Sequence, residues 1–227
     1  MTIKYHYDIE QGSDEWLSLR CGVLTASEMK LILTPTLKVS ANDKSRAHAQ
    51  EITAQRISQY VEPTFISDDM LRGVEIEPVA RELYAQTEPF VTECGFITRE
   101  FDFGVIGYSP DALVGDVGLW ECKAPRQKRH VETVLSGAVP VDHILQLQTG
   151  LLVTEREWID FSSYHGGLPM VTYRVYPDER VKSAIMQAAE QFHDAVNENI
   201  AKWDEIMKSN ARLVPTERVI EQEVYLG

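Results

Sequence analysis

Residues 108–123 read YSPDALVGDVGLWECK, and this stretch decides the centre of the fold. Gly115 and Gly118 mark a tight turn between two short apolar segments. Glycine is common at such turns because it adopts backbone conformations that other residues avoid. We therefore expect the two segments to pair as a β-hairpin.

Charged and apolar residues alternate along the second arm of this hairpin. Successive side chains of a strand point to opposite faces of the sheet. Glu121 and Lys123 therefore share one face, whereas Trp120 and Cys122 point to the other. The second face is apolar and can pack against the core of the domain.

Asp111, on the first arm, completes a candidate acidic site if it lies opposite Glu121. This pairing requires a loop with an odd number of residues, either the three residues 115–117 or a loop with a bulge at one of the glycines. Two carboxylates a few ångströms apart repel each other unless a cation lies between them. Such oxygen ligands favour Mg²⁺ or Mn²⁺.

Lys123 follows the second carboxylate by two residues and reaches the same site. A lysine there can orient or help to deprotonate a metal-bound water, or stabilise charge on a phosphorus atom. The spacing D-x9-E-x-K also occurs by chance in solvated hairpins. The preceding Ser109-Pro110 and the apolar opposite face favour a functional site.

A second group of candidate residues lies near the N-terminus. Residues 25–28, TASE, fit the S/T-x-x-E capping box and predict the start of a helix. The free N–H groups of a helix start bind phosphate, and Arg20 and Ser27 can add a guanidinium and a hydroxyl. The simpler alternative is an ordinary capped helix with an arginine on the surface.

Glu77 and Gln146 are further candidates. Glu77 follows Gly73 by one helical turn and can add a carboxylate to the metal site, although a helical glutamate more often faces solvent. Gln146 and Gln148 lie in an apolar helix, and Gln146 falls off its apolar stripe of Ile144, Leu147 and Leu151. A half-buried glutamine needs a hydrogen-bonding partner, so we expect Gln146 to have a bonded neighbour or a task.

The hydrophobic periodicity predicts an α/β fold with a mixed central sheet of about five strands and helices on both faces. The chain is expected to be one domain over residues 1–227, with a core at about 10–208, a tail at 209–227 and a mobile loop at 34–44. Helices are expected at 45–61, 67 to about 87, 141–153 and from 178 onward. In the last helix, the apolar residues that are expected on one stripe are Val181, Ile185, Ala188, Phe192, Ala195 and Trp203. Strands are expected at 90–97, 104–108, 111–114, 119–123, 157–164 and 170–176.

Composition excludes several classes of protein. Three cysteines without a CxxC pair argue against a disulfide scaffold, a zinc site or an iron–sulfur cluster. The sequence has no GxGxxG or GxxxxGK[ST] loop, and no apolar run long enough to cross a bilayer. A cytoplasmic location is therefore expected. The net charge of −13 argues against a broad DNA-coating surface, although bound metal ions would bring positive charge of their own.

Five motifs in a fixed order resemble the phage lambda exonuclease family, the YqaJ-like viral recombinases of the PD-(D/E)xK nuclease superfamily. The resemblance covers roughly residues 10–180, and the ordered set is far more specific than any one motif. It is weak over 35–45 and after Asn210. The five segments are EWLSLRCGVLTASE (15–28), GVEIE (73–77), SPD (109–111), ECK (121–123) and QLQ (146–148).

The resemblance implies a restriction-endonuclease-like core and a deoxyribonuclease that needs Mg²⁺, with Mn²⁺ as a possible substitute and two ions in the site. Such an enzyme degrades one strand of linear double-stranded DNA from a 5′-phosphorylated end, in the 5′-to-3′ direction, and releases mononucleotides. It leaves a 3′ single strand for recombination by strand annealing. The implied partners are two further copies of the chain, in a ring-shaped homotrimer around the DNA, and a single-strand annealing protein.

The resemblance also implies roles for individual residues. Asp111, Glu121 and the carbonyl of Cys122 would hold metal. Glu77, Lys123 and Gln146 would position or activate the water. The terminal phosphate would be held by Arg20, Ser27 and Ser109.

Two other readings of the sequence remain open. The same core serves endonucleases, which would cut closed circular DNA, and Cas4-like nucleases, which need a cysteine cluster that is absent here. A non-catalytic acidic protein that binds a nuclease or recombinase partner would suit the low pI. The complete set of Asp111, Glu121 and Lys123 argues against this last reading, and a Mg²⁺ titration of activity distinguishes it.

Overall fold

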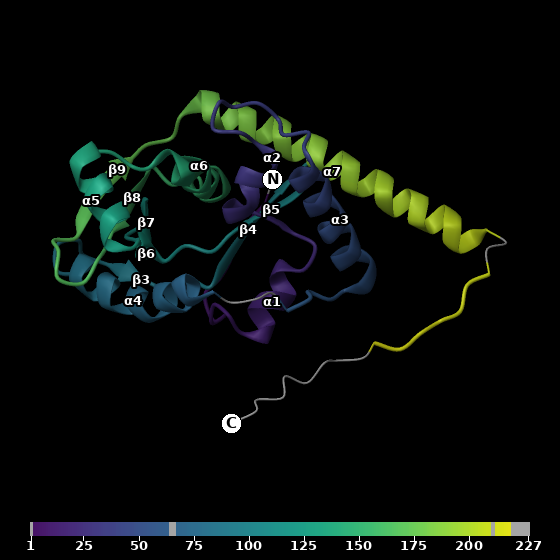
Figure 1. Ribbon diagram of the computed structural model, residues 1–227, viewed down its shortest axis with the longest axis horizontal. Helices are drawn as coiled ribbons and strands as arrows, with labels where there is room; N and C mark the ends of the chain where they lie inside the picture. The colour runs from purple at the N-terminus through teal and green to yellow at the C-terminus, as the bar shows by residue number, and fades with distance from the viewer. Residues whose placement is uncertain (1, 64–66, 210–211, 219–227) are drawn as a thin grey trace.

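The computed structural model describes residues 2–63, 67–209 and 212–218, and it contains two mixed β-sheets flanked by helices (Figure 1). The five-stranded sheet confirms the predicted central sheet. Its strands, in spatial order, are β3 (Val91–Thr92), β6 (Ala112–Val114), β7 (Gly118–Lys123), β8 (Trp158–Ser163) and β9 (Val171–Val175). Only the pair β7–β8 is parallel.

A four-stranded sheet, which the sequence did not predict, lies beside the first. Its order is β1 (Ile3–His6), β4 (Phe96–Phe101), β5 (Gly104–Tyr108) and β2 (Leu24–Thr25), with β2 and β5 parallel. The single strand predicted at 90–97 is therefore wrong, because the chain leaves the first sheet after β3 and enters the second at β4. Between them, a side chain on Gly95 would lie 1.9 Å from the carbonyl oxygen of Ile9, so only glycine fits this crossing.

The hairpin at the centre of the sequence has the odd-length turn that the candidate site requires. Ala112 pairs with Trp120 and Val114 with Gly118, which leaves three residues, 115–117, in the turn. Gly115 has a φ of 52°, a left-handed conformation that glycine adopts without strain. Continued by one residue, this register places Asp111 opposite Glu121.

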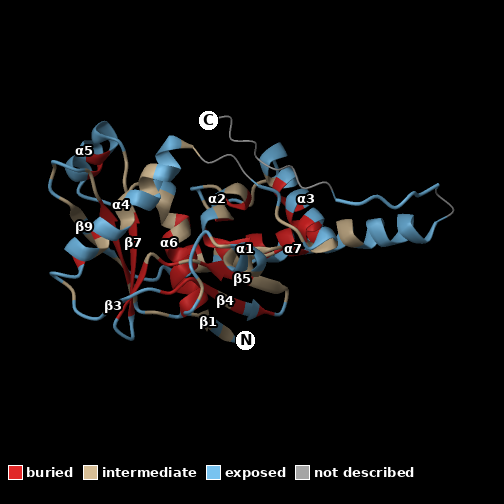
Figure 2. Cartoon of the chain, turned by 90° about the horizontal axis from the view of Figure 1, so that it is seen from below, coloured by how far each residue is buried: buried red, intermediate tan, exposed pale blue. Residues whose placement is uncertain are grey.

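Helices cover both faces of the five-stranded sheet, as expected. On one face, α4 (Asp68–Tyr84) packs Ala80 and Tyr84 against Trp120 and Cys122. On the other, α6 (Val141–Thr154) contributes to the main core and contacts both sheets. Figure 2 shows α6 and the central strands as the buried interior. None of the helices in the described ranges is both long and apolar enough to span a bilayer.

The remaining helices frame this core. They are α1 (Asp14–Arg20), the 3-10 turn η1 (Ala26–Glu28), α2 (Met29–Ile32), α3 (Asp43–Ser58), α5 (Gln127–Ser136) and α7 (Glu179–Lys208). Packed elements begin at Ile3, and the part of the predicted tail at 210–211 and 219–227 lies outside the described residues.

The last helix, α7, follows its predicted apolar stripe for only part of its length. Val181, Ile185 and Phe192 are buried against the core. Ala195 and Trp203, which we expected on the same stripe, are exposed. Figure 1 shows that the C-terminal part of α7 extends past the body of the molecule, which accounts for Trp203. Ala195 is exposed although the next residue, Val196, is buried, so Ala195 faces away from the core.

Candidate active site

Glu121 is the centre of the candidate site and is 1% exposed. Its Oε1 atom accepts hydrogen bonds from Lys123 Nζ and from Gln146 Nε2, both at 2.6 Å. Its Oε2 atom accepts a hydrogen bond from the hydroxyl of Tyr108 at 2.8 Å. Three donors from β7, α6 and β5 thus converge on one buried carboxylate, which offsets the cost of burying its charge.

Asp111 lies beside Glu121, as the hairpin register requires. Its Oδ2 atom accepts a hydrogen bond from the backbone N–H of Cys122 at 2.6 Å. Burial and, after it, the neighbouring charge of Glu121 raise the pKa of Asp111 well above its ordinary value. Asp111 and Glu121 therefore repel each other when both are ionised, and a cation between the two carboxylates would relieve this repulsion.

Lys123 supplies one positive charge to this pair. Burial lowers the pKa of Lys123, but attraction by Glu121 and Asp111 and the hydrogen bond to Glu121 outweigh it and raise the pKa overall. Lys123 is therefore a cation in this arrangement. It is suited to polarising a water or stabilising charge on a phosphate.

Glu77 joins the site from α4. The pKa of Glu77 is raised overall, mainly by burial; the charge of Arg81 lowers it, and the charge of Glu121 raises it. Glu77 and Glu121 are therefore near enough to interact. Arg81 Nη2 lies 3.5 Å from Glu77 Oε1, and its Nη1 lies 3.4 Å from the carbonyl oxygen of Asp111. Arg81 thereby links α4 to the acidic pair.

The donor set suits a magnesium ion. Within the described part of the chain, no three His, Cys, Asp or Glu side chains are close enough to form a metal-binding group by themselves. Mg²⁺ is usually bound by one or two carboxylates, and waters and substrate phosphate complete its shell. Asp111 and Glu121 supply such a pair, and the main-chain carbonyl of Cys122 directly follows Glu121 on β7.

A second polar group forms where α1 approaches the end of β5. The indole of Trp16 donates a hydrogen bond to Ser109 Oγ at 2.9 Å. The Arg20 guanidinium lies 4.2 Å from the centre of the Trp16 ring and donates to Thr25 Oγ1 at 3.4 Å. Thr25 Oγ1 in turn lies 3.2 Å from Ser27 Oγ. The three predicted phosphate-binding residues therefore belong to one contact network.

This network adjoins the acidic pair through the four-stranded sheet. In the parallel pair β2–β5, Leu24 lies beside Ile106 and Thr25 beside Gly107. Because β2 and β5 run in the same direction, the turn after β2, which contains Ser27, lies near Ser109, just after the end of β5. Ser109 is two residues before Asp111. The candidate phosphate group and the candidate metal group are thus neighbours.

The helix start predicted at Thr25 is present but short. Glu28 Oε2 accepts a hydrogen bond from Thr25 N at 2.9 Å, and the Thr25 side chain faces the backbone N–H of Glu28, as a capping box requires. The Thr25 hydroxyl also donates to Glu28 Oε2 at 2.6 Å. Only the three residues of η1 and the four of α2 follow it. Such a short helix has a small dipole, so phosphate binding here depends on the side chains of Arg20 and Ser27.

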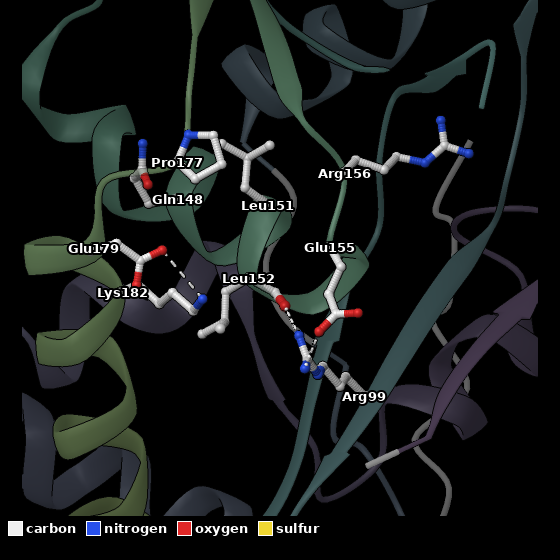
Figure 3. Close-up of a pocket in the computed structure, with 9 residues that line it drawn as sticks. All are labelled: Arg99, Gln148, Leu151, Leu152, Glu155, Arg156, Pro177, Glu179 and Lys182. Atoms are coloured by element: carbon white, nitrogen blue, oxygen red, sulfur yellow. Dashed lines mark hydrogen bonds and ion pairs between the residues drawn. The ribbon is translucent and has the colours of Figure 1, made fainter. Parts of the chain in front are cut away.

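Gln148 has a different role from Gln146. It is 5% exposed, donates to the Tyr176 carbonyl and accepts from Asp178 N, both at 2.8 Å. It borders a cavity of about 250 Å³ between α6 and the start of α7 (Figure 3). Glu121 and Lys123 do not line this cavity, so it is separate from the candidate site.

Sequence reasoning missed three residues of the site, namely Trp16, Arg81 and Tyr108. Trp16 binds Ser109, Tyr108 binds Glu121, and Arg81 contacts the Asp111 carbonyl as well as Glu77, so most of these contacts join separate elements and no local pattern reveals them. Burial, followed by the charges of Glu121 and Asp111, raises the pKa of Tyr108, so its hydroxyl stays protonated and donates. The only available signals were the position of Trp16 one turn before Arg20, and of Arg81 one turn after Glu77.

A mixed sheet that carries an acidic pair and a lysine on one hairpin, flanked by helices, defines the nuclease class of fold. A family model for the YqaJ-like viral recombinase domain matches residues 15–157. The chain therefore belongs to the YqaJ-like viral recombinase family, and the resemblance seen in the sequence is confirmed. A search of curated protein sequences gave no match.

Solved structures agree with this assignment. An alkaline exonuclease from Laribacter hongkongensis, LHK-Exo, is 30% identical, with a TM-score of 0.77, and the match covers 86% of this chain and 98% of the other. The structure of LHK-Exo in complex with dAMP is also 30% identical and covers 86% of this chain and 98% of the other, with a TM-score of 0.75. A phage-related exonuclease from Haemophilus somnus shares the fold, with a TM-score of 0.63 at 13% identity, and the match covers 80% of this chain and 96% of the other. The family match and the 30% identical structures support a nuclease or exonuclease.

Proposed function

We propose that this chain is a Mg²⁺-dependent exonuclease that degrades one strand of linear double-stranded DNA in the 5′-to-3′ direction from a 5′-phosphorylated end. It releases mononucleotides and leaves a 3′ single strand for annealing. Mn²⁺ can replace Mg²⁺, and two ions take part. The structure of the related LHK-Exo with dAMP, a mononucleotide, supports the proposed product class.

One observation carries this proposal, namely the adjacency of the two polar groups. Asp111, Glu121, Lys123 and Gln146 form a hydrogen-bonded acidic centre, and the network that includes Arg20 begins two residues away at Ser109. A site that cleaves beside a terminal phosphate needs both groups at this spacing. An endonuclease has no need for a separate binding site for a terminal phosphate.

The residues of the chain have distinct tasks in the proposed reaction. Asp111, Glu121 and the Cys122 carbonyl would hold the metal, and the bound metal would supply activation of water and stabilisation of the leaving oxygen. Lys123 Nζ and Gln146 Nε2 meet at one oxygen of Glu121, where they orient the attacking water. Glu77 adds negative charge at the rim of the site. Arg20, Ser27 and Ser109 hold the terminal phosphate of the strand being degraded.

The test uses linear duplex DNA with a 5′-phosphate or a 5′-hydroxyl, in Mg²⁺ or EDTA, beside closed circular DNA. We expect mononucleotides from the phosphorylated linear DNA alone, and only with Mg²⁺. Lys123→Ala should lower the rate by roughly 10²-fold or more, because it removes a group that acts on the reacting atoms. Lys128→Ala is the matched control, because the Lys128 side chain is 87% exposed on α5.

Other results would assign the protein differently. Cleavage of the closed circle would identify an endonuclease on the same core. Absence of cleavage with every substrate and metal ion would favour the non-catalytic acidic binding protein. Equal loss in Lys123→Ala and Lys128→Ala would show that the acidic centre is not the catalytic site.

A further inference from the structure

Tyr108 is a buried residue of the candidate site that the proposed mechanism leaves without a role. It ends β5, is 1% exposed, and donates its hydroxyl to Glu121 Oε2 at 2.8 Å. The other oxygen of Glu121, Oε1, receives both Lys123 and Gln146. Tyr108 therefore occupies the oxygen that the proposed catalytic groups do not use.

Gly150 makes the room in which Tyr108 lies. A side chain on Gly150 would lie 2.9 Å from both Cε1 and Cζ of the Tyr108 ring, closer than such atoms approach. Gly150 follows Gln146 by four residues on α6, so both lie on the same face of the helix. Glycine destabilises a helix interior relative to alanine, and space for the Tyr108 ring gives this glycine a physical reason.

We propose that Tyr108 and Gly150 form a positioning pair that fixes the orientation of the Glu121 carboxylate for metal binding. The inference rests on the proposed role of Glu121 as a metal ligand. The terminal torsion of a glutamate has a broad energy minimum, so the carboxylate of a lone glutamate rotates readily. A buried donor on Oε2 prevents this rotation, because turning the carboxylate would break the hydrogen bond.

The consequence is a single defined arrangement at the acidic centre. Oε1 stays directed at Lys123 and Gln146, and the free lone pairs of Glu121 keep one direction relative to Asp111. Groups that orient a ligand in this way typically change metal affinity or activity by 10- to 100-fold when they are removed. Tyr108 acts through its hydrogen bond to Glu121, so it is a positioning residue.

The chain contains a matched control for this role. Tyr84 is 2% exposed and donates its hydroxyl to Asp160 Oδ2 at 2.6 Å. It lies on α4, and its ring stacks on Trp120 on the face of β7 opposite Glu121. Tyr84→Phe and Tyr108→Phe thus each remove one buried hydroxyl from one carboxylate and keep the ring.

The experiment measures Mn²⁺ binding to the full-length protein by calorimetry without DNA, and separately kcat, KM for DNA and the half-saturating Mg²⁺ concentration. Tyr108→Phe should weaken Mn²⁺ binding, or lower kcat, by roughly 10- to 100-fold and leave KM for DNA unchanged. Gly150→Ala should cause a similar loss, because it displaces the ring. The double variant Tyr108→Phe/Gly150→Ala should lose little more metal affinity or kcat than either single variant, since the two residues act as a unit. Tyr84→Phe should match the wild type in every one of these measurements.

Each outcome bears on the proposal. Wild-type values in Tyr108→Phe, or equal losses in Tyr108→Phe and Tyr84→Phe, would overturn the positioning role while leaving the proposed nuclease function intact. A wild-type protein that binds Mn²⁺ but cleaves no DNA would contradict the proposed function, and the binding data would still decide the role of Tyr108. A wild-type protein that binds no Mn²⁺ would contradict both the proposed function and the positioning role of Tyr108.

Discussion

Arg20 shows how the chain prepares a single side chain for an anion. Its guanidinium lies over the ring of Trp16, 4.2 Å from the centre, and 5.8 Å from the centre of Phe96. Burial lowers the pKa of Arg20, which means that its charge is poorly solvated. A poorly solvated cation held by aromatic rings gains more from a phosphate than an exposed one does.

At the residue scale, Arg20→Lys should reduce the preference for 5′-phosphorylated over 5′-hydroxyl DNA by about 10-fold, because lysine cannot form a two-point contact with a phosphate. The rate on 5′-hydroxyl DNA should change little. Initial rates on the two substrates check this. Arg46→Lys is the control, since that side chain is 63% exposed and pairs with Asp43. An unchanged preference in Arg20→Lys would place the phosphate elsewhere.

One buried histidine of α7, His193, is hydrogen-bonded to α3. Its Nδ1 atom accepts a hydrogen bond from Arg56 Nη2 at 3.0 Å, and Arg56 Nε donates to the Gly22 carbonyl at 2.8 Å. Burial and then the charge of Arg56 lower the pKa of His193 to about 4. His193 is therefore neutral in the folded protein at neutral pH, and it binds a proton more readily in the unfolded chain.

At the scale of this helix pair, folding stability should fall as the pH drops below about 6.5, the ordinary pKa of histidine. Between pH 6.5 and 4 the unfolded chain binds the proton and the folded chain does not. His193 alone should thus lower the free energy of unfolding by about 2 kcal/mol between pH 8 and pH 5.

Urea unfolding of the wild type and of His193→Gln at both pH values measures this effect. Glutamine can still accept the bond from Arg56 but does not titrate, so the variant should show a smaller difference between the two pH values. Equal differences in the two proteins would show that His193 is not the titrating group.

Charge is the main problem at the scale of the whole molecule. The chain carries a net charge of −13, yet its proposed substrate is a polyanion. A ring of three copies around the DNA would need a positive surface only in its channel, and most of the negative charge could face outward.

The proposed trimer makes a measurable prediction. Light scattering should give a mass three times the 25.8 kDa of the chain. Run lengths on long DNA, measured with excess competitor DNA, should depend little on salt, because an enclosed substrate cannot leave by losing ionic contacts alone. A monomeric mass, or release of DNA at modest salt, would count against the ring.

The sequence by itself determined the local features of the site. Alternation along the strand placed Glu121 and Lys123 on one face, and the odd-length loop at 115–117 aligned Asp111 with Glu121. The capping box at Thr25 and the helix containing Gln146 were also predicted correctly. These features depend on the periodicity of a strand or helix and on turn chemistry, which a few neighbouring residues decide.

Only the tertiary structure decided which distant residues meet. Tyr108 and Gly150, 42 positions apart in the numbering, share one space, and Trp16 binds Ser109 across 93 positions. The sequence also did not predict that residues 90–97 divide between strands of two sheets, or that Trp203 is exposed near the end of α7. The physical reason is that such contacts depend on how elements pack, and packing is a property of the whole core that no local periodicity encodes.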